Sequence, residues 1–164
     1  MAVECFLKFE GPELKGESVG SEHTEEIDVL SWSWGASQSG TMHIATGGGA
    51  GKANVGDLTI TKWCDKASPN LMQRCINGKH FEKATLTCRK AGGEAPIPYL
   101  KIEMEKVLIT SVQTSGSGSE DRFMENVALN FATYKETYTP QKPDGTADSE
   151  VGPVGWKIAE NAEP

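Results

Sequence analysis

The stretch Ile27-Asp28-Val29-Leu30-Ser31-Trp32-Ser33-Trp34-Gly35 carries the clearest strand pattern in this 164-residue chain. Side chains of a strand alternate between two faces. One face of a regular strand here would carry Ile27, Val29, Ser31 and Ser33, and the other Asp28, Leu30, Trp32 and Trp34. We predict that the two tryptophans enter the core, and that the two serines lie on the opposite, wetter face.

Strand character continues on both sides of this stretch. Apolar residues at strand spacing occur in residues 3–9, 55–63, 84–90, 99–114 and 125–138, and a last apolar trio lies in residues 154–158. The segments 99–114 and 125–138 are long enough to span two sheets or to contain a bulge. Turn residues such as Gly11 and Pro12 separate the strands, so we expect a mainly antiparallel arrangement.

One segment has helical rather than strand spacing. Ser68 fits the N-cap, Pro69 fits the first helical position, and Gly78 follows the last turn as a stop. The apolar residues between them share one helix face: Leu71, Met72, Cys75 and Ile76. We predict a helix of about ten residues that docks this face on the sheet.

Length and composition indicate a single domain. The chain has the size of one domain, and no internal repeat or change of composition divides it. Many glycines, 18 in all, favour short strands joined by turns over a helical bundle. We therefore predict one α+β domain, mainly β, spanning residues 1–164.

The charge balance excludes several classes of partner. A net charge of −7 opposes contact with nucleic acids and anionic membranes, whose binders normally carry a basic field. No apolar run is long enough to cross a membrane, and the first residues do not resemble a secretory signal. The four cysteines lack a close-spaced framework, which fits synthesis in a reducing cytoplasm.

A nucleotide site is disfavoured by the residues around Gly51 and Lys52. A phosphate-binding loop would need glycine where Thr46 stands and serine or threonine where Ala53 stands. The segment that follows has strand rather than helix spacing. We expect no nucleotide cofactor.

A serine hydrolase is a second alternative, raised by the Gly-x-Ser-x-Gly pattern of residues 16–20. That chemistry needs a strand before Ser18 and a helix after it, and both flanks have loop composition.

A zinc site is a further alternative, because Cys64, Cys75, His80 and Cys88 lie in one region. Their spacing, however, does not match that of structural zinc sites. His23 and His43 likewise have no obvious partner for general-base work. We expect no enzyme, no metal and no catalytic residues.

The long glycine-rich segment 36–54 indicates that the protein works through its surfaces. A loop of this length usually binds something or is disordered. Exposed strand edges could pair head to tail into a ring, with the loop docking on the next ring. A carbohydrate-binding module with several tryptophans would look similar, so the residues alone leave both alternatives open.

Several blocks along nearly the whole chain resemble the Hcp (haemolysin-coregulated protein) family. They include His23-Thr24-Glu25-Glu26 followed by residues 27–35 and 37–40, then 49–52, Asp65-Lys66-Ala67-Ser68-Pro69-Asn70-Leu71 and Arg89-Lys90-Ala91-Gly92-Gly93-Glu94; residues 120–122, 125–127, 130–132, 140–141 and 155–156 match as well. This family forms the inner tube of type VI secretion systems. Their order and spread make the resemblance specific.

The resemblance implies a fold, an assembly and partners. It implies a compact antiparallel two-sheet β-barrel with one α-helix at its side, and hexameric rings that stack into a tube. It also implies export to the medium or to target cells without a cleaved signal peptide, effector proteins held in the ring lumen, and contacts with contractile sheath and spike proteins.

Combining both lines of reasoning gives candidate site residues. Ser31 and Ser33 are expected to face the lumen, because small hydroxyls leave a wide hydrophilic wall; the alternative is that they solvate the outside. The loop with Gln38, Met42, His43 and Lys52 is expected to make ring-to-ring contacts.

Overall fold

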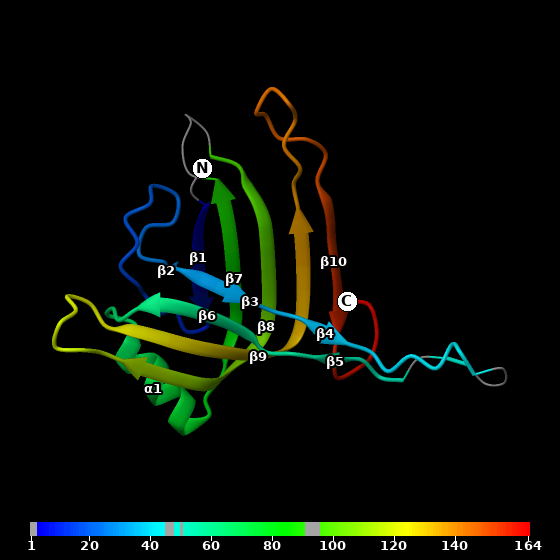
Figure 1. Cartoon of the computed structure of the whole chain (residues 1–164), viewed down its shortest axis with the longest axis horizontal. Coiled ribbons are helices and arrows are strands. Elements are labelled where there is room, and N and C mark those ends of the chain that lie inside the picture. Colours follow the sequence, from blue (N-terminus) through cyan, green and yellow to red (C-terminus); the bar gives the residue numbers. More distant parts are fainter. Residues whose placement is uncertain (1–2, 45–47, 50, 91–95) are drawn as a thin grey trace.

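An antiparallel sheet, nearly closed into a barrel, dominates the computed structural model, which describes residues 3–44, 48–49, 51–90 and 96–164 (Figure 1). Its strand order is β2-β1-β7-β8-β9-β6-β3, with β10 added to β9 and with β4 and β5 forming a separate two-stranded ribbon. The elements are β1 (Val3–Glu10), β2 (Ile27–Val29), β3 (Ser31–Ser33), β4 (Ala36–Ser37), β5 (Asn54–Val55), β6 (Leu58–Trp63), α1 (Ser68–Asn77), β7 (Phe81–Lys90), β8 (Pro98–Ser115), β9 (Met124–Tyr138) and β10 (Val151–Lys157). The predicted fold class, mainly β with one helix, is confirmed.

The barrel closes at Leu30, in the middle of the stretch that the sequence predicts as one strand. β2 pairs with β1 at one end of the strand order, and β3 pairs with β6 at the other end. Leu30 lies between them, and its amide donates to the carbonyl oxygen of Thr61 at 2.8 Å. One short segment therefore joins both ends of the sheet.

This crossing also changes which side chains face the core. Ile27 and Val29 are buried on β2, whereas Ser31 and Ser33 are exposed on β3. The predicted placement of Ile27 and Val29 on the serine face is thus wrong, because the alternation shifts by one residue at Leu30. The other half of the prediction is confirmed: Trp32 and Trp34 are half-buried and pack against the core.

β8 and β9 are the long strands that the sequence predicts, and β9 bridges two parts of the sheet. β9 pairs with β6 along Met124–Leu129 and with β10 along Thr133–Tyr138, while β8 pairs with it along most of its length. The register between β8 and β9 shifts between Ile109 and Ser111, so the expected bulge is present.

The helix α1 begins and ends close to the predicted residues but docks through a narrower strip. Gly78 ends it with φ at 70°, a left-handed conformation that glycine adopts without strain. Leu71 is fully buried, whereas Met72 is 37% exposed and Ile76 79% exposed. The predicted docking of Met72 and Ile76 is therefore wrong, since only the side of the helix around Leu71 meets the sheet.

Ser68 is not the N-cap either, because its hydroxyl belongs to a buried polar cluster. Ala67 occupies the N-cap position. The Ser68 hydroxyl donates to the Glu125 carboxylate at 2.7 Å and lies 3.1 Å from the Lys62 ammonium. Lys62 also contacts Glu125 at 2.7 Å and Asp65 at 3.0 Å. These contacts tie the start of α1 to β6 and β9.

This cluster is an ionised network inside the protein. Lys62 has no exposed surface, and Glu125 is 2% exposed. Burial disfavours the charged Glu125 carboxylate, but hydrogen bonds from Lys62 and Ser68 outweigh it and hold the pKa of Glu125 below its usual value. Removing one member should therefore leave an uncompensated buried charge.

We predict that Lys62→Met lowers the free energy of unfolding by about 3–5 kcal/mol, the usual cost of breaking a buried ion pair from one side. Urea denaturation followed by circular dichroism measures it. Lys66→Met is the matched control, since the Lys66 ammonium is half exposed and should leave the midpoint unchanged. Equal midpoints for both variants would show that the buried network does not hold the helix in place.

Candidate functional surfaces

Uncharged polar side chains cover the outer face of the closed half of the barrel. Strand registers place them, together with the small side chain of Ala128, in two rows that run across β3, β6, β9 and β8: Ser31, Thr61, Asn126 and Gln113 form one, and Ser33, Thr59, Ala128 and Ser111 form the other. We call these residues the polar wall. Ser31 and Ser33, the predicted lumen residues, both belong to it.

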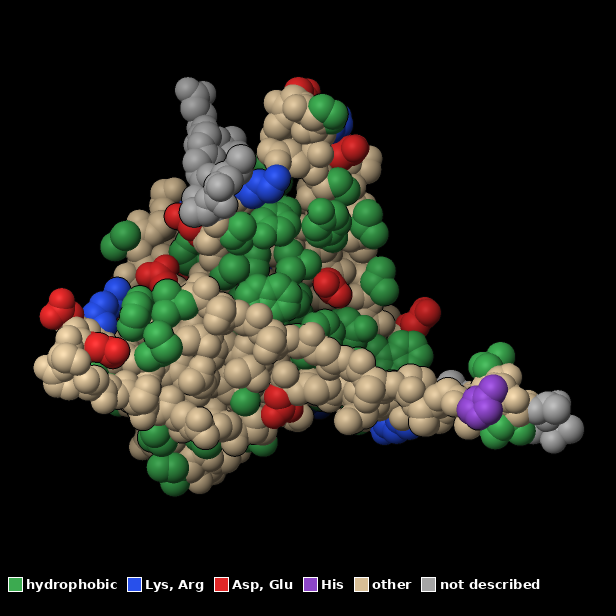
Figure 2. Space-filling model, viewed as in Figure 1, with side chains coloured by type: hydrophobic (Ala, Val, Ile, Leu, Met, Phe, Trp, Pro, Cys, Tyr) green, Lys and Arg blue, Asp and Glu red, His purple; other side chains and the backbone are tan. Residues whose placement is uncertain are grey.

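The chemistry of the polar wall is that of hydroxyl and amide groups. Thr61 donates its hydroxyl hydrogen to the Asn126 side-chain oxygen at 2.8 Å. At the margin of the polar wall, directly before β6, the Asp57 carboxylate accepts hydrogen bonds from Thr110 at 2.6 Å and Asn130 at 2.8 Å. Figure 2 shows the area over β6 and β9 as largely neither hydrophobic nor charged. Such a surface stays hydrated without attracting either sign of charge strongly.

In the described residues 36–44, 48–49 and 51–55, the segment predicted as a long loop is a two-stranded arm that projects from the barrel (Figure 1). β4 and β5 pair through Ala36 with Val55 and Ser37 with Asn54. Farther out, the Thr41 hydroxyl donates to the Gly49 carbonyl oxygen at 2.8 Å and accepts from the Gly49 amide at 3.1 Å. Backbone and side-chain bonds thus hold the two sides of the arm together.

The predicted stacking residues all lie exposed on this arm: Gln38, Met42, His43 and Lys52. Met42 is 81% and Ile44 48% exposed, so apolar side chains reach solvent far from the core. Residues 45–47 and 50, which include part of the glycine run, lie outside the described residues. The arm and the polar wall are separate surfaces that meet near β3.

An apolar surface that the sequence analysis missed lies where β8, β9 and β10 extend past β3. Registers place its members on the core-facing side of the sheet: Leu100 is opposite Tyr138, Tyr134 is opposite Trp156, and Val154 is opposite Glu136. We call Leu100, Tyr134, Tyr138, Val154 and Trp156 the apolar shelf.

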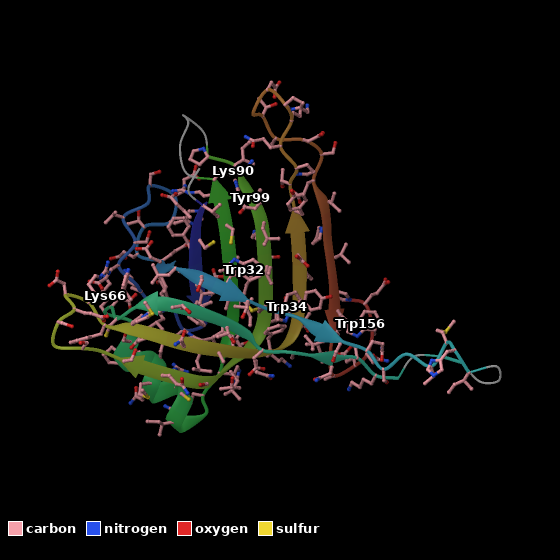
Figure 3. All side chains as sticks on the ribbon, in the orientation of Figure 1. Trp32, Trp34, Lys66, Lys90, Tyr99 and Trp156 are labelled. Atoms are coloured by element: carbon pink, nitrogen blue, oxygen red, sulfur yellow. The ribbon has the colours of Figure 1, made fainter. Side chains whose placement is uncertain are left out.

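The apolar shelf is open to solvent in the single chain. Tyr138 is 48% and Val154 65% exposed. Figure 2 shows hydrophobic side chains gathered above β3, and Figure 3 places Tyr99, Trp32, Trp34 and Trp156 around the same part of the sheet. Trp34 contacts Tyr134 edge-on at 4.8 Å between ring centroids. The barrel core therefore continues into a surface that the described part of the chain leaves open in that view.

Ser18 and His23, which were considered for catalysis, are both held in local contacts. Ser18 is 3% exposed, and its hydroxyl oxygen accepts from the Gly20 amide at 3.3 Å. His23 stacks on Phe6 at 4.4 Å and bonds to Glu26 at 2.9 Å. Within the described ranges, no group of three or more His, Cys, Asp or Glu side chains could hold a metal ion. No described helix has the length and apolar character to cross a membrane.

Comparison with known proteins gives one consistent answer. A family model described as "Type VI secretion system effector, Hcp" matches residues 6–138. Protein hcp1 of Pseudomonas aeruginosa is 56% identical over 165 residues, which cover 99% of each chain.

Solved structures agree with this match. A structure described as a type six secretion system protein has a TM-score of 0.92 at 30% identity and covers 99% of this chain and 100% of its own. Hcp1 from Salmonella typhimurium has a TM-score of 0.79 at 36% identity, with complete coverage of both chains.

We predict that Thr41→Val loosens the arm without changing the barrel. The variant loses both hydrogen bonds between the Thr41 hydroxyl and Gly49. Exchange of the Gly49 amide hydrogen should accelerate about fivefold, as expected when the free energy of local opening falls by ~1 kcal/mol. Hydrogen exchange read by NMR measures it. Thr24→Val is the control, since Thr24 donates only to Gly20 in a distant turn. Unchanged exchange at Gly49 would contradict the described pairing.

Proposed function

Since the chain belongs to the Hcp family of type VI secretion proteins, we propose that it is a structural subunit of the inner tube of such a system. In this proposal the whole chain, residues 1–164, acts as one domain. Six copies close into a ring, and rings stack into a hollow tube. The observation that carries the proposal is the apolar shelf, because a surface of this kind in a secreted building block requires a partner.

Ring closure would cover both the apolar shelf and an open strand edge. Among the described strands, β10 pairs only with β9, and on its other edge only Lys157 is bonded within the described chain, to Ala162. Exposed edges of this kind invite pairing with another chain. A second copy that approaches β10 would bury Tyr138, Val151 and Val154, whose exposed fractions are 48%, 58% and 65%. Repeating one such heterologous contact around an axis closes a ring.

The polar wall suits the inner surface of such a ring. It carries hydroxyl and amide groups, which hold water and offer many weak hydrogen bonds to a passing protein. Ser31 and Ser33 lie at its edge, where the chain crosses from β2 to β3. A lumen of this chemistry would hold effector proteins without fixing them strongly.

The arm suits contacts between stacked rings. It extends well beyond the barrel and exposes Met42, His43 and Ile44 near its end (Figures 1 and 2). Apolar side chains at the end of a paired arm would bury surface only against another subunit. From its membership in the family, we further propose that the protein contacts sheath and spike proteins and is exported to the medium or to target cells.

The alternative of a carbohydrate-binding module fits less well. Such a module needs aromatic rings that are free to stack on sugars. Trp32 and Trp34 instead pack against the core, and Trp34 donates its indole hydrogen to the Gly56 carbonyl oxygen at 3.0 Å. Trp32 and Trp34 are therefore already engaged, and the exposed ring of Tyr138 is assigned to the contact between subunits in this proposal.

We predict that light scattering gives a molar mass close to six times the 17.7 kDa of one chain. The double variant Tyr138→Glu/Val154→Glu should reduce the mass toward one chain, because it places charge on the surface that the ring buries. Gln73→Glu, on the exposed side of α1, is the control and should leave the mass unchanged. A wild-type protein that stays monomeric at micromolar concentration would contradict ring formation.

We also predict that Ser33→Glu leaves the ring intact but alters effector retention, since it adds charge to a wall that has none there. Co-purification of effectors with rings of constant mass measures it. Ser21→Glu, in an exposed turn far from β3, serves as the control. Loss of assembly in Ser33→Glu would mean that Ser33 lies in a subunit interface and not in the lumen.

A further inference from the structure

Two cysteines far apart in the sequence meet at one point of the sheet. Cys5 on β1 lies directly opposite Cys88 on β7 in the antiparallel register, and their sulfur atoms are 2.8 Å apart. The other two cysteines lie elsewhere: Cys64 follows β6 and is exposed, and Cys75 lies on α1. All of them are free thiols in this structure.

The backbone holds this pair in a geometry that a disulfide accepts. Directly opposite residues of antiparallel strands have Cα atoms about 4.5–5.5 Å apart, within the range of about 4.4–6.8 Å found in disulfides. β1 and β7 stay in register from Val3 opposite Lys90 to Glu10 opposite Lys83, so the strands cannot slide locally. Closure would shorten the distance between the two sulfur atoms from 2.8 Å to the ~2.05 Å of a disulfide bond.

The two thiols differ in their surroundings. Cys5 is half-buried, whereas Cys88 is 1% exposed. The hydrogen bond with Cys88 holds the pKa of Cys5 below its usual value, and the same bond together with burial raises the pKa of Cys88. The more exposed sulfur is therefore also the one that ionises first, which suits it to react first with an outside oxidant.

We propose that Cys5 and Cys88 are a redox pair, a dithiol in a reducing compartment that closes to a cross-strand disulfide in an oxidising one. The occasion for this change, export from the cytoplasm, rests on the proposed function; the chemistry does not. With a small-molecule disulfide such as oxidised glutathione, the Cys5 thiolate attacks one glutathione sulfur and releases one glutathione thiolate.

The second step completes the electron balance. Cys88 loses its proton, attacks the Cys5 sulfur of the mixed disulfide and releases the second glutathione. The protein loses two electrons and two protons, and one oxidised glutathione becomes two reduced ones. The new bond links β1 to β7. It closes a long loop of the chain, because the two cysteines are 83 positions apart in the sequence.

The experiment equilibrates the reduced full-length protein in buffers of increasing ratio of oxidised to reduced glutathione. One series uses native protein, and a parallel series passes through unfolding in urea and refolding. The second series removes any limit that the burial of Cys88 sets on its reaction. We expect the titratable thiols to fall from four to two, with a mass loss of about 2 Da and a peptide that joins Cys5 to Cys88. The oxidised form should melt on the order of 10 °C higher.

Cysteine variants show which residues form the disulfide bond. Cys64→Ser/Cys75→Ser should close the bond like the wild type, whereas Cys5→Ser and Cys88→Ser should each prevent it. Glutathione adducts that never resolve, a bond between other cysteines, or retention of all four thiols in both series would overturn the inference. Light scattering of the same samples separates the two proposals, since closure occurs within one chain whether or not rings form.

Discussion

The strand β9 has to serve two partners along one edge, and most of the molecule follows from that constraint. β6 takes its first part, Met124–Leu129, and β10 takes its second part, Thr133–Tyr138, while β8 occupies the other edge. Because β6 leads back through β3 and β2 to β1, only the first part is enclosed in the barrel. The second part carries this face out into solvent, where it is mostly apolar but also carries Glu136.

This division produces two different surfaces from one sheet. In the enclosed half, the inner face is filled by side chains such as Leu58, Ile60 and Leu129, and the outer face shows the hydroxyl and amide groups of the polar wall. In the open half, the inner face becomes the apolar shelf. One chain therefore presents a hydrated surface and an apolar surface whose burial would stabilise association, which is what a ring subunit with an open lumen needs.

Part of the fold could be predicted from alternation, because β6 and the first part of β9 keep a period of two. Even the inward position of Lys62 follows from Leu58 and Ile60, although a lysine is not expected in a core. Its partner Glu125 lies on β9 and reaches it only through tertiary pairing, so no local pattern predicts that the two charges are buried together.

The errors arise where distant parts of the chain set the local geometry. The change of face at Leu30 depends on the pairing of β2 with β1 and of β3 with β6, which no local pattern contains. The exposure of Met72 and Ile76 depends on how closely α1 approaches the sheet. The apolar shelf escaped notice for the same reason: its tyrosines have ordinary core spacing, and only the length of β9 relative to β6 leaves them uncovered.

The central claim is that identical copies cover one another's apolar shelf and enclose the polar wall. Electron microscopy of the purified protein tests this claim most directly. The account predicts annular particles with six equal subunits around a stain-filled hole. Particles the size of one chain, or compact assemblies without a central hole, would contradict it.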